Sequence, residues 1–166
     1  MIHLLTCGPS LLTSWGSVYL PEDDLIVGVN RACQTFKVDW ACYSDAIIPD
    51  GPIIRPSQGY VISQGLTGWD CGRQFNSFPS WDGWEGWSGK QPFYTFPNAL
   101  AWCLRTFTQA EITIYGMDMS NEGCLGQPDW NFNHTQERWE DEAKFLKHCW
   151  KVGGDRIRIG LPLAEI

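Results

Sequence analysis

Residues 2–10 read Ile-His-Leu-Leu-Thr-Cys-Gly-Pro-Ser, and this stretch decides the fold of the chain. An apolar run from Ile2 to Thr6 is followed at once by Gly, Pro and Ser, which predicts a buried strand that ends in a turn. Five later apolar runs are also predicted to be strands. They cover residues 25–29, 38–43, 60–62, 111–115 and 157–161.

These runs are continuous rather than alternating, which is typical of parallel strands that are covered on both faces. Two helices are predicted between them, over residues 98–107 and 134–151. Asn133 can cap the second helix, and Gly153-Gly154 ends it. Strands that alternate with helices favour an α/β fold with a doubly wound, mostly parallel sheet. The length of 166 residues suits a single domain.

The segment of residues 64–91 breaks this pattern, because it is rich in Gly, Trp, Ser and Asp and has no clean period. A loop of this length is usually functional or disordered, and its many tryptophans argue against disorder. Its residues Trp81, Trp84 and Trp87 are spaced three apart, and aromatic rings suit the stacking of sugars and bases. They could form a lid over an acceptor, attach the loop to the sheet, or bind a protein partner.

The composition excludes several classes of protein. A net charge of −7 and a pI of about 4.8 argue against a nucleic-acid-binding surface, although not against a small anionic ligand. The chain contains neither a signal-peptide pattern nor an apolar run long enough to span a membrane. Seven cysteines occur without a C-x-x-C pair, which indicates reduced thiols in a cytoplasmic protein and argues against a zinc site.

In an open α/β sheet, ligands bind outside the carboxyl ends of the strands. The loop of Cys7, Gly8, Pro9 and Ser10 follows the first predicted strand, and Asn30 follows the second. Gly8 allows a ligand to approach the backbone, and Ser10 offers a hydroxyl and a backbone N–H. We therefore expect these residues to bind a nucleotide, although the same residues would also serve as a simple turn and helix caps.

Acidic residues and a histidine follow other predicted strands or begin a helix. Asp45 and Asp118 could hold a metal ion or a ribose, or could cap helices. His134 is the candidate for acid–base chemistry, because the positive end of a helix dipole favours the neutral form that a base requires. It could equally be an exposed histidine at a helix start. His3 and His148 are expected to be structural.

Four stretches occur in the same order as in a known family. They are Gly8-Pro-Ser-Leu11, Val29-Asn30, Thr95 to Asp118, and the tail from His134 through Glu142-Ala-Lys-Phe-Leu146 to Pro162. Together they resemble the bacterial lipooligosaccharide sialyltransferases, which have a Rossmann-like fold and use a CMP-sugar donor. The resemblance covers roughly two thirds of the chain and does not include the Trp-rich middle.

This resemblance implies a role for particular residues. Gly8, Ser10 and Asn30 would bind the nucleotide, and Thr95 would join the donor site. His134 would be the general base that deprotonates the hydroxyl of a small-molecule or glycan acceptor. The nucleotide-sugar would be a substrate, and no metal or other cofactor would be required.

Two alternatives remain open at this point. The same order of strand ends also resembles the archaeal-type hydroxymethylpterin pyrophosphokinases, which use ATP and magnesium. Under that interpretation Asp45 and Asp118 would be metal ligands. The third hypothesis is a non-catalytic nucleotide-binding, protein-binding or inhibitor module on the same fold.

Overall fold

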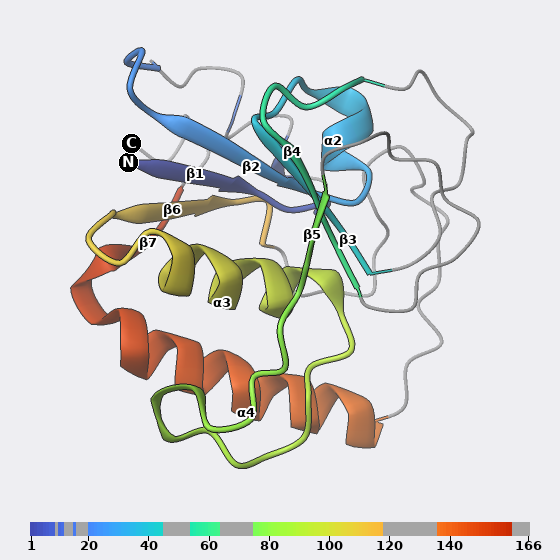
Figure 1. Ribbon diagram of the computed structural model, residues 1–166, viewed down its shortest axis with the longest axis vertical. Helices are drawn as coiled ribbons and strands as arrows, with labels where there is room; N and C mark the ends of the chain where they lie inside the picture. Colours follow the sequence, from blue (N-terminus) through green and yellow to red (C-terminus); the bar gives the residue numbers. More distant parts are fainter. Residues whose placement is uncertain are drawn as a thin grey trace.

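The computed structural model describes residues 1–8, 10–11, 15, 20–44, 54–63, 75–117 and 136–160. These residues form a seven-stranded sheet in the order β5-β4-β3-β2-β1-β6-β7, in which every neighbouring pair is parallel (Figure 1). The strands are β1 (Ile2–Leu5), β2 (Leu25–Val29), β3 (Trp40–Tyr43), β4 (Gly59–Ile62), β5 (Phe75–Ser77), β6 (Ile112–Tyr115) and β7 (Ile157–Ile159). The helices are α2 (Ala32–Thr35), α3 (Thr95–Thr106) and α4 (Gln136–Gly153), with 3-10 turns η1 (Trp84–Gly86) and η2 (Gly154–Arg156).

Helices cover both faces of this sheet, so the predicted doubly wound, Rossmann-like α/β fold is confirmed. Helices α3 and α4 lie side by side on one face, and α2 lies on the other (Figure 1). Consecutive strand residues therefore enter two cores. In β1, Leu4 packs in the core beneath α3 and α4, whereas Leu5 packs with Cys33 of α2 on the opposite face. Burial on both faces explains why the strands read as continuous apolar runs.

The segment of residues 64–91 was expected to be an irregular loop, and this expectation is wrong in one respect. Its residues 75–77 form β5, which pairs in parallel with β4 at one end of the sheet. The sequence Phe-Asn-Ser is too short to show a period, and only its backbone pairing with β4 defines it as a strand.

Within the described ranges, no helix has the length and apolar composition needed to cross a membrane.

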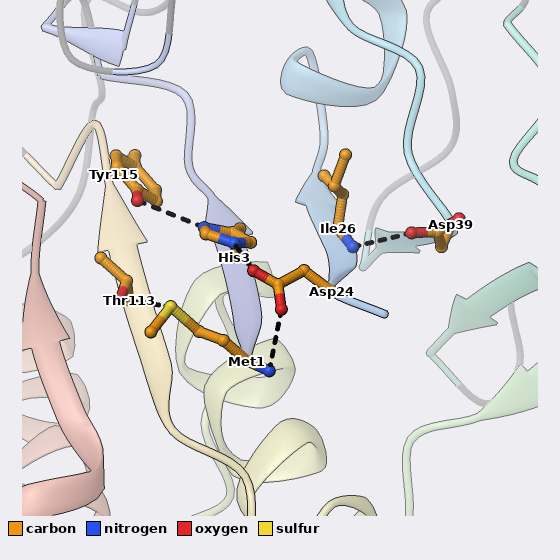
Figure 2. Close-up of polar contacts among 7 residues, drawn as sticks. All are labelled: Met1, His3, Asp24, Ile26, Asp39, Thr113 and Tyr115. Carbon is orange, nitrogen blue, oxygen red and sulfur yellow. Dashed lines mark hydrogen bonds and ion pairs between the residues drawn. The ribbon is translucent and has the colours of Figure 1, made fainter. Parts of the chain in front are cut away.

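A chain of polar contacts, buried at His3 and Tyr115, joins β1, β6 and the turn before β2 (Figure 2). His3 is 3% exposed, and its Nε2 donates to the carboxylate of Asp24 at 2.8 Å. In the neutral ring, Nδ1 then accepts from the hydroxyl of Tyr115 at 3.2 Å. The N-terminal amino group of Met1 donates to the second oxygen of Asp24 at 3.2 Å. His3 is therefore structural, as the sequence predicted, and lies beside the amino end of β2.

The hydrogen bond from His3 lowers the pKa of Asp24 below its usual 3.8, and the amino group of Met1 adds to this effect. The carboxylate therefore stabilises the fold above pH 3.8, and this contribution is lost as the pH falls through the lowered pKa. Asp24→Asn is expected to lower the urea midpoint at pH 7, with a deficit that shrinks below pH 3.8. The exposed neighbour Asp23→Asn is the control, and an equal deficit at pH 7 and pH 2.5 would contradict the assignment.

Candidate functional site

The order of the strands identifies one edge of the sheet as the place for a ligand. From β1 the chain adds β2, β3, β4 and β5 on one side, and then places β6 and β7 on the other side of β1. The loops after β1 and β6 therefore lead in opposite directions from neighbouring strands. In parallel α/β sheets this switch point opens a crevice at the carboxyl ends of the strands.

The loops that follow β1 and β6 are joined by hydrogen bonds. Thr6 donates from both its N and its Oγ1 to the carbonyl of Tyr115, at 2.9 and 2.8 Å. The N–H of Gly8 donates to the carbonyl of Gly116 at 3.0 Å. Gly116 has φ +75, and a Cβ there would lie 2.9 Å from the Cβ of Leu11. The loop after β1 is thus fixed in place, and the N–H of Gly8 is already engaged within the protein.

Two other predicted residues of this loop lie at the same edge. Cys7 is half-buried, and its Sγ lies 3.5 Å from the carbonyl of Val29, the last residue of β2. Ser10 is half-buried in the turn that follows Gly8. The loop after β1 therefore contacts the end of β2 as well as the loop after β6.

Asn30 and Thr95 are brought together from positions 65 residues apart. The hydroxyl of Thr95 donates to Asn30 Oδ1 at 3.1 Å, and the N–H of Ser44 donates to the same hydroxyl at 3.1 Å. Because Thr95 Oγ1 accepts from Ser44, its one proton goes to Asn30. The chain Ser44–Thr95–Asn30, called here the strand-end network, links the ends of β2 and β3 to the first residue of α3.

The local backbone explains why Asn30 can take this position. It has φ +50, in the left-handed region that asparagine adopts more readily than most residues. Its N–H donates to the carbonyl of Cys42 in β3 at 3.0 Å, which holds the turn after β2 against the next strand. Thr95 is 3% exposed at the start of α3, so its hydroxyl is fixed by packing. The strand-end network is therefore rigidly positioned.

Two polar atoms at this edge are buried without a hydrogen-bond partner. They are the Oγ of Ser44, at the end of β3, and the Nη2 of Arg31, which directly follows Asn30. Sequence reasoning did not single out Arg31. The available signal was its place one residue after a strand-end asparagine, but the sequence could not show that the guanidinium would be buried.

Four of the predicted site residues lie outside the described residues. They are Pro9, Asp45, Asp118 and His134. Their predicted roles in nucleotide binding, metal binding and catalysis therefore stay predictions. Within the described part of the chain, no group of three or more His, Cys, Asp or Glu side chains could hold a metal ion.

The three tryptophans of the loop pack on the helices. Trp81 is 0% exposed, and its Nε1 donates to Asn98 of α3 at 2.8 Å. Trp84 and Trp87 are half-buried, and both rings contact Phe145 of α4. Trp81 therefore has no free surface for stacking on a sugar ring, which corrects its assignment to an acceptor site or lid. This packing matches the alternative in which the tryptophans attach the loop to the rest of the fold.

A cleft of about 850 Å³ lies elsewhere, along the C-terminal parts of α3 and α4 and beside η1. His148 lies in its wall and contacts the carbonyl of Trp84 at 3.1 Å. Arg156 also lies in the wall of the cleft. Its guanidinium donates to the carbonyl of Leu104, in the last turn of α3, and to the carbonyls of Phe107 and Ala110, which follow the helix. These contacts join α4 to η1 and η2 to the end of α3, so we interpret His148 and Arg156 as structural residues. We therefore place the candidate site at the strand ends, where the strand-end network lies.

The fold and the strand-end network define the class of the chain, a Rossmann-like α/β protein with a polar site at the carboxyl ends of its central strands. Comparison with known proteins gives no narrower assignment. No family model matches the chain, and no curated protein or solved structure matches it significantly.

Proposed function

We propose that this protein is a glycosyltransferase-like enzyme that binds a nucleotide-activated sugar, of the CMP-sugar type, at the carboxyl ends of β1, β2 and β3. The observation that supports this proposal best is the strand-end network. It connects Asn30 and Thr95, two residues that the resemblance to sialyltransferases assigns to the donor site. A Rossmann-like sheet with its switch point between β1 and β6 supports the same location.

The network determines what Asn30 offers to a ligand. Its Oδ1 accepts from Thr95, so the Nδ2 amide group is left to donate. Among the hydrogen bonds of the described residues, none uses Nδ2. Asn30 is half-buried, and its Nδ2 does not belong to the buried polar atoms that lack a partner in the described residues. The two N–H bonds of Asn30 Nδ2 can therefore donate to acceptor oxygens of a pyrimidine base, a ribose or a phosphate.

The proposed chemistry is the transfer of a sugar from its nucleotide to a hydroxyl. His134 takes the proton of the acceptor hydroxyl, and the acceptor oxygen forms a bond to the anomeric carbon. The bond between that carbon and the phosphate oxygen breaks, and the nucleotide leaves with the bonding electron pair. Asp118 and the loop of Cys7, Pro9 and Ser10 contribute to nucleotide binding in this scheme, and no metal is required.

The cysteines support a proposed cytoplasmic location. All of those in the described residues are free thiols, and they are Cys7, Cys33, Cys42, Cys103 and Cys149. Burial raises the pKa of Cys33 and of Cys149 to about 12, which keeps both thiols protonated. Thiols that are not joined in disulfides are typical of reducing compartments.

Nucleotide binding tests the proposal. Thermal shift and calorimetry with CMP, UDP, GDP and ATP, each with and without magnesium, are expected to show binding of CMP without metal. Thr95→Val keeps the shape of the side chain but removes the hydroxyl between Asn30 and Ser44. It is expected to weaken CMP binding about tenfold, the effect of losing roughly 1.4 kcal/mol. Thr106→Val, at an exposed position on the same helix, is the matched control.

The outcomes separate the hypotheses. His134→Ala should abolish turnover of a CMP-sugar while CMP affinity stays nearly unchanged. Binding of ATP only with magnesium would favour the pyrophosphokinase alternative instead. If no nucleotide binds, or if Thr95→Val and Thr106→Val bind CMP equally to the wild type, the proposed donor site is wrong.

A further inference from the structure

Arg31 is unusual among the arginines of the described residues. Its Nη2 is buried and has no hydrogen-bond partner, and none of the described carboxylates forms an ion pair with it. Arg156 shows the contrast, because its guanidinium donates to three backbone carbonyls at the end of α3. A guanidinium has donors only and retains its charge, so burial without an acceptor is costly. An anion bound at the guanidinium of Arg31 would supply the missing acceptor.

A second unpartnered atom lies at the same edge of the sheet. Strands β2 and β3 are neighbours, and Val29 is in register with Cys42. The residues that follow them, Asn30-Arg31 and Tyr43-Ser44, therefore occupy adjacent positions at the carboxyl ends. Ser44 Oγ is buried and unpartnered there, as is Arg31 Nη2. Two buried donors that lack an acceptor thus come from adjacent strand ends.

We propose that Arg31, together with the hydroxyl of Ser44, binds a phosphoryl group. This inference rests on the proposed function for the identity of the ligand, since the phosphoryl group would be that of the nucleotide donor. The planar guanidinium can donate two parallel hydrogen bonds to phosphate oxygens, which a lysine cannot do. Asn30, between β2 and Arg31, adds a third donor to the same edge. Both Arg31 and Ser44 are half-buried as residues, whereas Arg31 Nη2 and Ser44 Oγ themselves are buried.

Binding of a phosphoryl group by Arg31 predicts effects of substitution that a purely structural role would not. Arg31→Met keeps the length of the side chain and removes the unpaired charge. Without a ligand, it is expected to melt at the same temperature as the wild type or a few degrees higher. It should bind inorganic pyrophosphate at least about tenfold more weakly, the effect of losing one charge-assisted hydrogen bond. Arg31→Lys should bind with intermediate affinity, and exposed Arg55→Met should behave as the wild type.

The experiment titrates inorganic phosphate, pyrophosphate, cytidine and CMP into these variants at constant ionic strength. Pyrophosphate binding that depends on Arg31, without any binding of CMP, would support the anion site and refute the proposed nucleotide donor. If Arg31→Met binds CMP and pyrophosphate as tightly as the wild type does, the anion site is refuted, whereas the proposed nucleotide donor is not. A wild type that binds none of the anions, or an Arg31→Met that melts well below the wild type and keeps its pyrophosphate affinity, would also overturn it. If Arg31→Met does not fold, Arg31→Lys decides the question by its pyrophosphate affinity relative to Arg55→Met.

Discussion

Trp81→Ala is expected to lower the free energy of unfolding by about 3–5 kcal/mol, the range for removing a large buried aromatic side chain. Trp81 is 0% exposed and packs against Trp84 and against Phe145 of α4. Its indole N–H also donates to Asn98 of α3. The substitution therefore leaves a cavity between the loop and both helices, and an amide oxygen without its donor.

Urea unfolding of three variants separates these contributions. Trp81→Phe keeps most of the apolar volume but loses the hydrogen bond, so its effect should be intermediate. Trp87→Ala removes a half-buried ring and should cost less than Trp81→Ala. If Trp81→Ala destabilised the protein no more than Trp87→Ala, the packing of the loop on the helices would be refuted.

Glu142→Ala is expected to have the second large effect, about 2–4 kcal/mol, because it leaves two backbone donors without an acceptor. Glu142 is 2% exposed and lies in α4. It accepts from the N–H groups of Phe93 and Tyr94, immediately before α3 begins at Thr95. One side chain of α4 therefore holds the start of α3, and with it the hydroxyl of the strand-end network.

The same substitution tests the connection between stability and the site. If the start of α3 positions Thr95, Glu142→Ala should weaken CMP binding in addition to lowering the urea midpoint. Glu142→Gln keeps one carbonyl acceptor and should fall between Glu142→Ala and the wild type. Glu22→Gln, at an exposed position, is the control for loss of charge. Full stability in Glu142→Ala would show that these hydrogen bonds contribute little.

The fold could largely be predicted from the sequence because the strands are buried on both faces. A run such as Leu25–Val29 is apolar throughout for that reason, and each such run appears as a strand in the structure. Strand β5 could not be predicted, since Phe-Asn-Ser is three residues long and becomes a strand through its pairing with β4. Helix α2 has only four residues, too few for a helical period.

The candidate site could be predicted only in part. The end of β2 identified Asn30, and the resemblance added Thr95, but their direct hydrogen bond depends on how α3 packs against the sheet. Arg31 was missed because a single arginine in a loop is usually exposed, and only packing reveals that its Nη2 is buried. The spacing of the tryptophans left stacking on a ligand, attachment of the loop and binding of a protein partner open, and only the packing on α3 and α4 shows their contacts.

The most direct test of the central claim is a titration of CMP into the ¹⁵N-labelled protein, followed by amide and indole resonances. A ligand at the carboxyl ends of β1, β2 and β3 should shift the side-chain amide of Asn30 and the backbone amides of Gly8 and Ser44. The indole of Trp84, which lines the cleft beside α3 and α4, should stay unchanged. Shifts confined to Trp84 and His148, with none at Asn30, would contradict the account.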